Sequence, residues 1–237
     1  MTAIRNDQNI VQGHLDPPLS PLGKTQAMKL AEHLQLVPFS EAWTSDLARA
    51  EETAKVLLTF HPRVSLNIDP RLRSRGMGSL QGKKWQDGVE YPADVESDQI
   101  LSTRLKEWLD NLITYHTPVT SPAGTPRTPI SPADPGSGTV LAVTHEECLL
   151  SLLRLLTSSN KDNHNHALQL HVPQTVDTSL RLGNTAMTIV RVWWEDVGGL
   201  SPFGDGQLGM GKMEPRGRLE AWGVEDHLID DTEQPVE

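Results

Sequence analysis

Arg49 and His145 are two side chains whose types could take part in chemistry, the first as a permanent cation and the second as a hydrogen-bond donor. Arg49 ends the segment Ser45-Asp46-Leu47-Ala48-Arg49, and His145 directly follows the apolar run 140–144. A guanidinium can hold two oxygens of one anion and keeps its charge at any working pH, and an imidazole can donate to the same oxygens. Taken alone, an arginine on a helix is ordinarily a solvated charge, and a histidine at a strand end is as often a satisfied polar residue. Both candidates therefore need support from their context.

The other candidates are less specific. His14 is undecided on its own. Arg71, Arg73 and Arg75 alternate, so they could line one face of an extended segment and meet an anion, or lie in solvent. The run 160–166 holds two histidines, but its irregular ligand spacing favours a polar loop over a metal site. We therefore predict no metal site.

Apolar periodicity and capping residues predict helices that alternate with strands. Ser20-Pro21 supplies a capping hydroxyl and a proline at the first helical position. The expected elements are a helix from residue 21, a strand at 42–44, a helix capped by Asp46, a strand at 64–68, a helix over 101–112, a strand at 140–144 that is buried on both faces, a helix over 149–156 and a strand at 186–194. Strands separated by helices imply an α/β fold with a sheet covered on both sides.

The length and local composition predict one domain with two less ordered parts. A chain of 237 residues can bury one good core, and we expect the domain to span residues 1–195. The segment 117–138 is dense in Pro, Ser, Thr and Gly, so we expect a mobile insertion there. Gly, Pro and acidic residues dominate 198–237, which we expect to be a disordered tail.

The charge and the single cysteine narrow the classes of function. The formal net charge of -10 has the wrong sign for a protein that binds nucleic acid by neutralising phosphates, so any phosphate site must be a local basic pocket. Cys148 lies in an apolar run and has no partner for an internal disulfide, which suits a reducing compartment. We find neither an apolar leader nor a membrane span, and expect a cytoplasmic protein with no membrane or nucleic-acid partner.

Several short motifs follow one another in an order that resembles a known family. They are Asn6 with Gln12-Gly13-His14-Leu15-Asp16, then Pro18-Leu19-Ser20-Pro21-Leu22-Gly23, Thr44–Ala50, Asp69–Arg73 with Gly78–Gly82, Glu96-Ser97 with Arg104, Val143-Thr144-His145 and Asn184–Thr188. From near its first residue to about Trp194, the chain resembles the histidine phosphatase superfamily, in its phosphoglycerate-mutase-like branch. Each motif is weak by itself, but the shared order and spacing make chance a poor explanation.

The resemblance implies both a fold and a reaction. The implied fold is a three-layer α/β sandwich with a mostly parallel sheet and helices on both faces. In the implied reaction a histidine nitrogen attacks a phosphoryl group, and water or a second hydroxyl resolves the phosphohistidine. Arg49 and His145 are the implied catalytic residues, because both would stabilise charge on the phosphoryl oxygens. Asn6, Gln12 and Gly13, together with Arg49, are the implied phosphate-binding residues, and no cofactor is implied.

The sequence departs from the family pattern at three places. The spacing puts the nucleophilic histidine, on a strand ending in Arg-His-Gly, just upstream of Met1, so we expect the chain to be truncated at its N-terminus. Ser74 stands where the family places its acid/base glutamate, and Gln81 replaces another common carboxylate. Glu146 and Glu147 follow the second histidine, where small residues are usual. Two carboxylates beside a phosphate would oppose anion binding unless they point away.

We therefore expect a phosphatase of small phosphorylated metabolites, such as a sugar bisphosphate, with an activity impaired in this chain by the missing nucleophile. The segment 12–20 resembles the fructose-bisphosphatase-like branch at least as well as the glycolytic mutases, and no long basic insertion for a mutase lid is evident. Two alternatives stay open. One is a non-catalytic relative that binds a phosphorylated ligand or a partner, and the other is a phosphoglycerate mutase.

Overall fold

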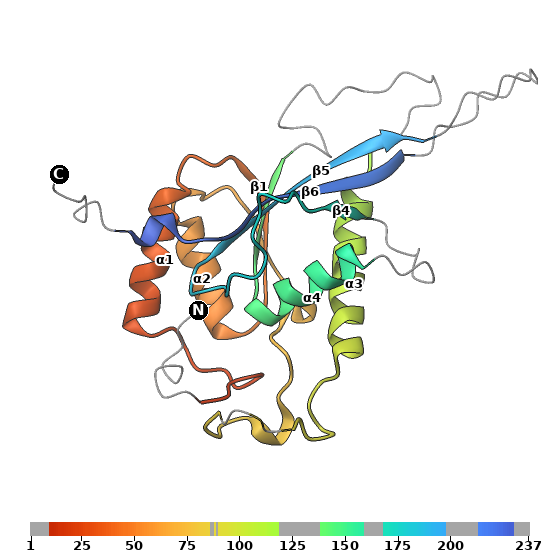
Figure 1. Ribbon diagram of the computed structural model, residues 1–237. Coiled ribbons are helices and arrows are strands. Elements are labelled where there is room, and N and C mark those ends of the chain that lie inside the picture. Colours follow the sequence, from red (N-terminus) through yellow and green to blue (C-terminus); the bar gives the residue numbers. More distant parts are fainter. Residues whose placement is uncertain are drawn as a thin grey trace, which may run out of the picture.

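The computed structural model describes residues 10–85, 88, 90–118, 138–158, 168–197 and 213–229 (Figure 1). Its helices and strands, in chain order, are α1 (Pro21–His33), β1 (Phe39–Thr44), α2 (Ala48–Leu57), β2 (Leu66–Ile68), α3 (Asp98–His116), β3 (Thr139–Val143), α4 (Glu146–Thr157), β4 (Gln169–His171), β5 (Met187–Asp196) and β6 (Met213–Val224). Four short 3₁₀ helices cover Leu58–Phe60, Pro70–Leu72, Gly78–Leu80 and Asp226–Leu228. Asn6, the run 160–166 and most of the expected 117–138 insertion lie outside the described residues.

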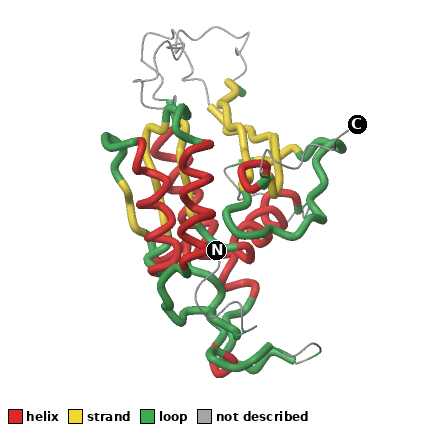
Figure 2. The backbone as a smooth tube through the Cα atoms, turned by 90° about the vertical axis from the view of Figure 1, so that its left-hand side faces the viewer, coloured by secondary structure: helices red, strands yellow, loops and turns green. Residues whose placement is uncertain are grey.

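A parallel three-stranded sheet, in the order β2-β1-β3, forms the first half of the fold. In its register, Ala42 of β1 is paired with Leu66 of β2 and Leu141 of β3. Helices α1 and α2 pack around Val143 on one face, and α3 and α4 pack around Trp43 on the other. Figure 2 shows helices lying against the strands of this sheet. The predicted α/β fold, with a parallel sheet covered on both faces, is confirmed.

The predicted helix starts are right for α1 and wrong for α2. At α1 the Ser20 hydroxyl accepts a hydrogen bond from an amide of the first turn at 3.0 Å. Asp46 does not cap α2, because its carboxylate accepts two bonds from the Arg73 guanidinium at 2.7 and 2.5 Å. A bidentate, charge-assisted pair is stronger than a single bond to an amide. The Ala48 amide of α2 is instead bonded by the Asp16 carboxylate at 2.6 Å, which ties an earlier loop to this helix.

A second three-stranded sheet, in the order β4-β6-β5, lies beside the first. Strand β6 is central, pairing in parallel with β4 and antiparallel with β5. Its core includes Leu182, Leu219 and Trp222, with leucines of α4 packed against them. None of the described helices is both long and apolar enough to cross a bilayer.

Strand β6 corrects the expectation of a disordered tail from residue 198 and of a domain that ends at residue 195. Residues 213–224 form the middle strand of the second sheet, and the Leu219 and Trp222 side chains are 1% and 5% exposed. The expectation failed because Gly, Pro and acidic residues on both sides lower the average hydrophobicity of the segment. What decides its order is the side-chain burial on one face together with the pairing to β5.

Strand β3 is less buried than its apolar sequence predicts. Val143 is buried, but Val140 and Leu141 are only half-buried and Ala142 is exposed. The run was expected to be covered on both faces, as in the middle of a parallel sheet. Among the described strands β3 pairs only with β1, so no described strand covers its other edge.

Replacing Trp222 by alanine should lower the free energy of unfolding by about 3–5 kcal/mol, because a large buried side chain leaves a cavity. Its indole Nε1 also donates to the Leu180 carbonyl at 3.1 Å, a bond that would be lost. Urea denaturation monitored by circular dichroism measures the change. Trp193→Ala is the control, since Trp193 is 37% exposed on β5. Equal, small losses for both variants would mean that residues 213–224 contribute nothing to the core.

Candidate functional site

Arg49 lies in the first turn of α2, and its side chain is 3% exposed. Its two terminal nitrogens donate to backbone carbonyls, Nη1 to Leu15 and Nη2 to Gly13, each at 2.9 Å. Burial lowers the pKa of this guanidinium, while the charges of Glu147 and Asp16 oppose that shift. Arginine nevertheless stays protonated in proteins. Arg49 therefore fixes the turn at Gly13–Leu15 and places a buried positive charge beside it.

Gly13 occupies a position that only glycine fits. Its φ of 51° lies in the left-handed region, and a Cβ there would be 2.6 Å from the Gln81 Oε1 and 2.9 Å from the Met77 side chain. The Gln81 Oε1 accepts a hydrogen bond from the His14 amide at 2.6 Å. Gln81, considered above only as a missing carboxylate, thus positions the turn. The neighbouring Gln12 Nε2 is buried and has no hydrogen-bond partner among the described residues.

His145 stands between β3 and α4 and is 8% exposed. Its Nε2 is buried and, like that of Gln12, finds no partner within the described part of the chain. Burial lowers the pKa of His145 well below its usual value, and the positive charges of Arg49 and Arg104 lower it further. The imidazole is therefore neutral near pH 7. An orphaned polar atom in a buried position is costly, and a ligand that bonds it would remove the cost.

The ion pair between Arg104 and Glu96 holds the backbone of the loop 71–76. Arg104 on α3 donates to the Glu96 carboxylate at 2.7 and 3.0 Å and to the Ser74 carbonyl at 3.0 Å. Glu96 in turn accepts the Gly76 amide at 2.8 Å. The Ser74 carbonyl is also 2.8 Å from the His14 ring. Arg104 and Glu96, noted in the sequence only as parts of a motif, thus join three segments around the site.

The alternating arginines of this loop do not converge on one anion. Arg71 pairs with Asp69 at 2.6 Å, and Arg73 with Asp46 at 2.5 Å. Hydrogen bonding from each arginine lowers the pKa of its carboxylate partner. Arg75 lines the same cavity as Gln12, Arg49 and His145, but it donates to the Glu96 carbonyl at 2.9 Å and pairs with Asp98. They serve chiefly to fix the loop.

A carboxylate stands beside Ser74, where the sequence lacks the expected glutamate. The Ser74 hydroxyl donates to Glu147 Oε2 at 3.3 Å, and Ser74 itself is 5% exposed. Glu147 belongs to the first turn of α4, two residues after His145. Glu146 turns elsewhere, accepting the Leu182 amide at 3.3 Å. From the sequence, both glutamates were expected only to oppose anion binding. The contact of Glu147 with Ser74 could not be predicted, because no spacing rule places residues 74 and 147 close together.

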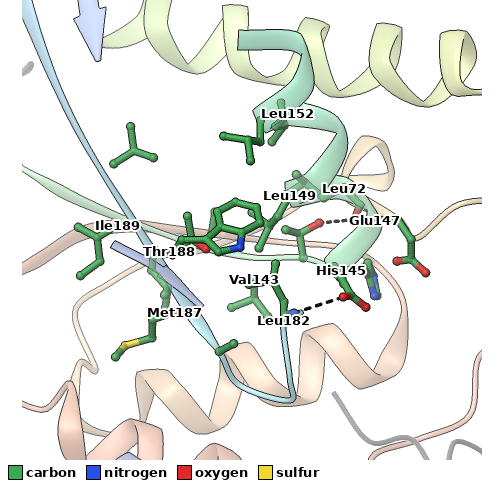
Figure 3. Close-up of a pocket in the computed structure, with 18 of the residues that line it drawn as sticks. Leu72, Val143, His145, Glu147, Leu149, Leu152, Leu182, Met187, Thr188 and Ile189 are labelled. Atoms are coloured by element: carbon green, nitrogen blue, oxygen red, sulfur yellow. Dashed lines mark hydrogen bonds between the residues drawn. The ribbon is translucent and has the colours of Figure 1, made fainter. Parts of the chain in front are cut away.

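One cavity brings most of the predicted site residues together. Gln12, Gly13, Arg49 and His145 all line it, along with Ser74 and Glu147. Figure 3 shows His145 and Glu147 at the start of α4, with Met187, Thr188 and Ile189 of β5 across the pocket. Asn6, the remaining predicted residue, lies outside the described residues. The arrangement offers a buried cation, a neutral imidazole and an exposed carboxylate to a ligand at one place.

Cys148 contributes no nucleophile to this place. Burial raises the pKa of its thiol to about 11, and its Sγ is 3.0 Å from the Arg73 carbonyl. Its burial in the apolar run is as predicted. In the part of the chain that the structure describes, no three His, Cys, Asp or Glu residues are grouped so that they could hold a metal ion.

Comparison with known proteins gives a consistent result. The model of the histidine phosphatase superfamily (branch 1) matches residues 2–118. Phosphoglycerate mutase-like protein 4 of Arabidopsis thaliana is 36% identical over 83 residues, and fructose-2,6-bisphosphatase TIGAR of Xenopus laevis is 34% identical over 82 residues. These alignments cover 35% and 33% of this chain and 36% and 30% of the two relatives. The matched segment thus spans only about a third of these relatives' length.

Solved structures align over more of the chain. Mycobacterial hydrolase 1 aligns with a TM-score of 0.63 at 23% identity, covering 94% of both chains. Mycobacterial glucosyl-3-phosphoglycerate phosphatase in complex with VO3 aligns with a TM-score of 0.62 at 22% identity, covering 94% of this chain and 95% of that one. At these identities the likeness establishes the fold.

Gly13→Ala should destabilise the protein by about 2–4 kcal/mol, since it adds a clash to the roughly 1–2 kcal/mol cost of a left-handed residue. Gly88→Ala is the matched control. Gly88 also has a positive φ, of 80°, but nothing lies within 4 Å of the Cβ it would gain. Chemical denaturation of both variants separates backbone strain from the clash with Gln81 and Met77. Equal losses would show that the turn is not tightly packed.

The depressed pKa of His145 should make the protein less stable in mild acid. Above the unfolded pKa of about 6.5, both states hold a neutral imidazole, and the folded state suffers no penalty. As the pH falls below that value, the unfolded state binds a proton that the folded state refuses, so stability falls by up to about 1.4 kcal/mol per pH unit until the folded pKa is reached. Urea midpoints between pH 7.5 and 5 measure the slope. His145→Gln should flatten it, and an unchanged slope would contradict the assignment.

Proposed function

This chain belongs to the histidine phosphatase superfamily, and from that premise we propose that it hydrolyses phosphate esters of small metabolites. Its curated relatives include phosphatases and mutases. The observation that supports the proposal is that Arg49, His145 and the Gly13 turn line one cavity. Two buried nitrogen atoms there, Nε2 of Gln12 and Nε2 of His145, lack hydrogen-bond partners among the described residues. Such nitrogens suit the oxygens of a phosphoryl group.

Arg49 and His145 have different tasks in the proposed site. Two N–H groups of Arg49 hold the turn carbonyls, and the guanidinium has five, so three are available to develop bonds to phosphoryl oxygens. A neutral His145 donates one hydrogen bond from whichever ring nitrogen carries the proton. Both groups are already in place before the substrate arrives, and this preorganisation favours the more highly charged transition state. The Gln12 amide nitrogen, buried at the same wall, adds an uncharged donor.

We assign the proton transfer to Glu147. In the first step a histidine nitrogen bonds to phosphorus, the bond between phosphorus and the ester oxygen breaks, and that oxygen takes the proton of the Glu147 carboxylic acid. In the second step the Glu147 carboxylate takes a proton from water, whose oxygen attacks phosphorus and releases phosphate and the histidine. Ser74 would orient the carboxylate through its hydroxyl.

The nucleophile is the part of the proposal that rests on resemblance alone. The family pattern places this histidine ahead of the segment 12–16, on an apolar strand that ends in Arg-His-Gly. The substrate is proposed to be a small phosphorylated metabolite, with sugar bisphosphates as one class. A phosphoglycerate mutase is the second candidate, since a mutase of Bacillus anthracis aligns with a TM-score of 0.54 at 25% identity, covering 67% of this chain. We also propose that the protein is located in the cytoplasm.

The test joins an apolar strand ending in Arg-His-Gly to the N-terminus and measures hydrolysis of p-nitrophenyl phosphate. Activity should appear, and Glu147→Gln should lower kcat by about 100-fold or more, the usual contribution of a general acid. Glu146→Gln should keep the activity within a few-fold, because its carboxylate turns to the Leu182 amide.

The outcomes separate the candidate functions. Equal loss for both glutamine variants would show that Glu147 is not the acid. A joined protein that stays inert, while inorganic phosphate raises its melting temperature and Arg49→Ala removes that rise, would favour a phosphate-binding protein. Transfer between the hydroxyls of phosphoglycerate, without net hydrolysis, would favour a mutase.

A further inference from the structure

The turn at residues 183–186, which leads into β5, forms part of the wall of the cavity. All four of its residues line the space that Arg49 and His145 also line. On one side the turn is tied to the start of α4, because the Glu146 carboxylate accepts the Leu182 amide at 3.3 Å. Glu146 directly follows His145 in the chain. The position of this turn therefore bears on the shape of the site.

Thr185 holds the turn in a strained conformation. Among the described residues it is the one non-glycine residue with a positive φ, which is 59°. Such a conformation is unfavourable for a β-branched residue, and it persists only where the surrounding structure enforces it. The Thr185 hydroxyl donates to the Asn184 carbonyl at 2.6 Å and lies 2.8 Å from Nε2 of His227. His227 is therefore one of the groups that hold the strained residue.

These two contacts fix the position of the proton on the His227 ring. The hydroxyl proton of Thr185 is used on the Asn184 carbonyl, so the hydroxyl oxygen accepts from His227, and Nε2 carries the ring proton. The other ring nitrogen, Nδ1, is buried and has no hydrogen-bond partner among the described residues. A second proton would place an unbonded N–H and a positive charge at Nδ1, which is costly in a buried position. The contact with Thr185 thus suits the neutral ring.

The surroundings of His227 also oppose a second proton. The 3₁₀ helix that carries it packs against α1 (Figure 1), where the His33 ring lies with its centroid 6.0 Å from that of His227. Burial is the main cause that lowers the pKa of His227. The positive charges on α1 lower this pKa further and the carboxylates of its own segment oppose the shift; these groups are His33 and Lys29, and Glu225 and Asp226. The turn contributes only the neutral Thr185 hydroxyl to the ring.

Glu225 adds a second bond from the same segment to the turn. Its Oε1 accepts the Gly183 amide at 2.9 Å. A Cβ at Gly183 would clash with that oxygen, so a larger residue there would push the carboxylate away. The segment 225–227 thus bonds the turn at both residue 183 and residue 185, from 42 positions further along the chain. The turn is held between this segment and α4.

We propose that His227 is a positioning residue, which through the Thr185 hydroxyl holds the turn 183–186 in the cavity wall and releases it when the ring takes a second proton. The structural part rests on these contacts alone, and the consequence for catalysis rests on the proposed function. A released ring titrates near pH 6.5, whereas the held ring resists the proton. The turn is therefore held above about pH 6.5 and is released progressively below it.

Amide hydrogen exchange at residues 183–186, corrected for the intrinsic effect of pH, tests the contact. Protection in the unaltered chain should fall by up to about tenfold between pH 7.5 and 5.5. His227→Ala should lose about threefold to tenfold of the protection at pH 7.5, because one hydrogen bond is lost. His227→Gln keeps an N–H that can donate to Thr185 and does not titrate, so it should restore the protection and remove its dependence on pH.

His61→Ala is the matched control for these variants. The His61 ring nitrogen lies 3.1 Å from the Leu34 carbonyl, and His61 does not line the cavity, so exchange at residues 183–186 should stay within twofold. Exchange that is unchanged in His227→Ala, or that depends on pH in His227→Gln as in the unaltered chain, would overturn the proposal. If His227→Ala fails to fold, the pH profiles of the unaltered chain and of His227→Gln still decide the question.

Hydrolysis of p-nitrophenyl phosphate separates this inference from the proposed function. In the protein with the joined strand, His227→Ala should raise KM by about threefold to tenfold and leave kcat within about twofold, since a loosened wall weakens the binding of substrate and transition state alike. His227→Gln should restore KM. An unchanged KM with altered exchange would limit His227 to stability and overturn the positioning role.

The two measurements can fail independently. A joined protein that is inert in every form, while exchange responds to His227 as expected, would refute the phosphatase and leave the held turn standing. Hydrolysis by a protein whose exchange at residues 183–186 does not respond to His227 would refute the held turn and leave the phosphatase standing.

Discussion

The bonds from Arg49 to the carbonyls of Gly13 and Leu15 are the interaction on which the site depends. A buried guanidinium costs free energy unless it is bonded, and here a turn in the left-handed conformation supplies the acceptors. The turn in turn needs glycine and the Gln81 side chain. The Asp16 carboxylate then ties the end of the same turn to the start of α2. Charge, turn and helix are thus positioned by one another.

A second group of ion pairs holds the facing loop. Arg104 and Glu96 bind the backbone at Ser74 and Gly76, while Arg73 is held by Asp46. Arg73 and Arg104 are each paired with a carboxylate, whereas the terminal nitrogens of the buried Arg49 bond to backbone carbonyls. The net charge of -10 is compatible with an anion site, since the potential is local. Among the described residues the Glu147 carboxylate is the one that accepts a hydrogen bond from the Ser74 hydroxyl, and for that reason we propose it for the proton transfer.

The second constraint on the structure is that the backbone N–H and C=O groups of the two sheets need hydrogen-bond partners. Within the described residues β3 and β5 are each paired on one side and face the same apolar cavity. Ala142 is exposed although it belongs to an apolar strand, because it lines this cavity.

The sequence by itself determined the helices, the strands of the first sheet, β5 and the family resemblance. The Ser20 cap, the apolar run of β3 and the periodic leucines of α3 are local patterns, so they can be read without tertiary contacts, and motif order identified Arg49, His145 and Gly13 as neighbours. Tertiary structure alone decided the rest. Asp46 pairs with Arg73 and does not cap α2. The segment 213–224 forms a central strand, and the Ser74 hydroxyl donates to Glu147, 73 residues away in the sequence. Each of these depends on partners distant in sequence, whose competition for a bond or for burial no local pattern records.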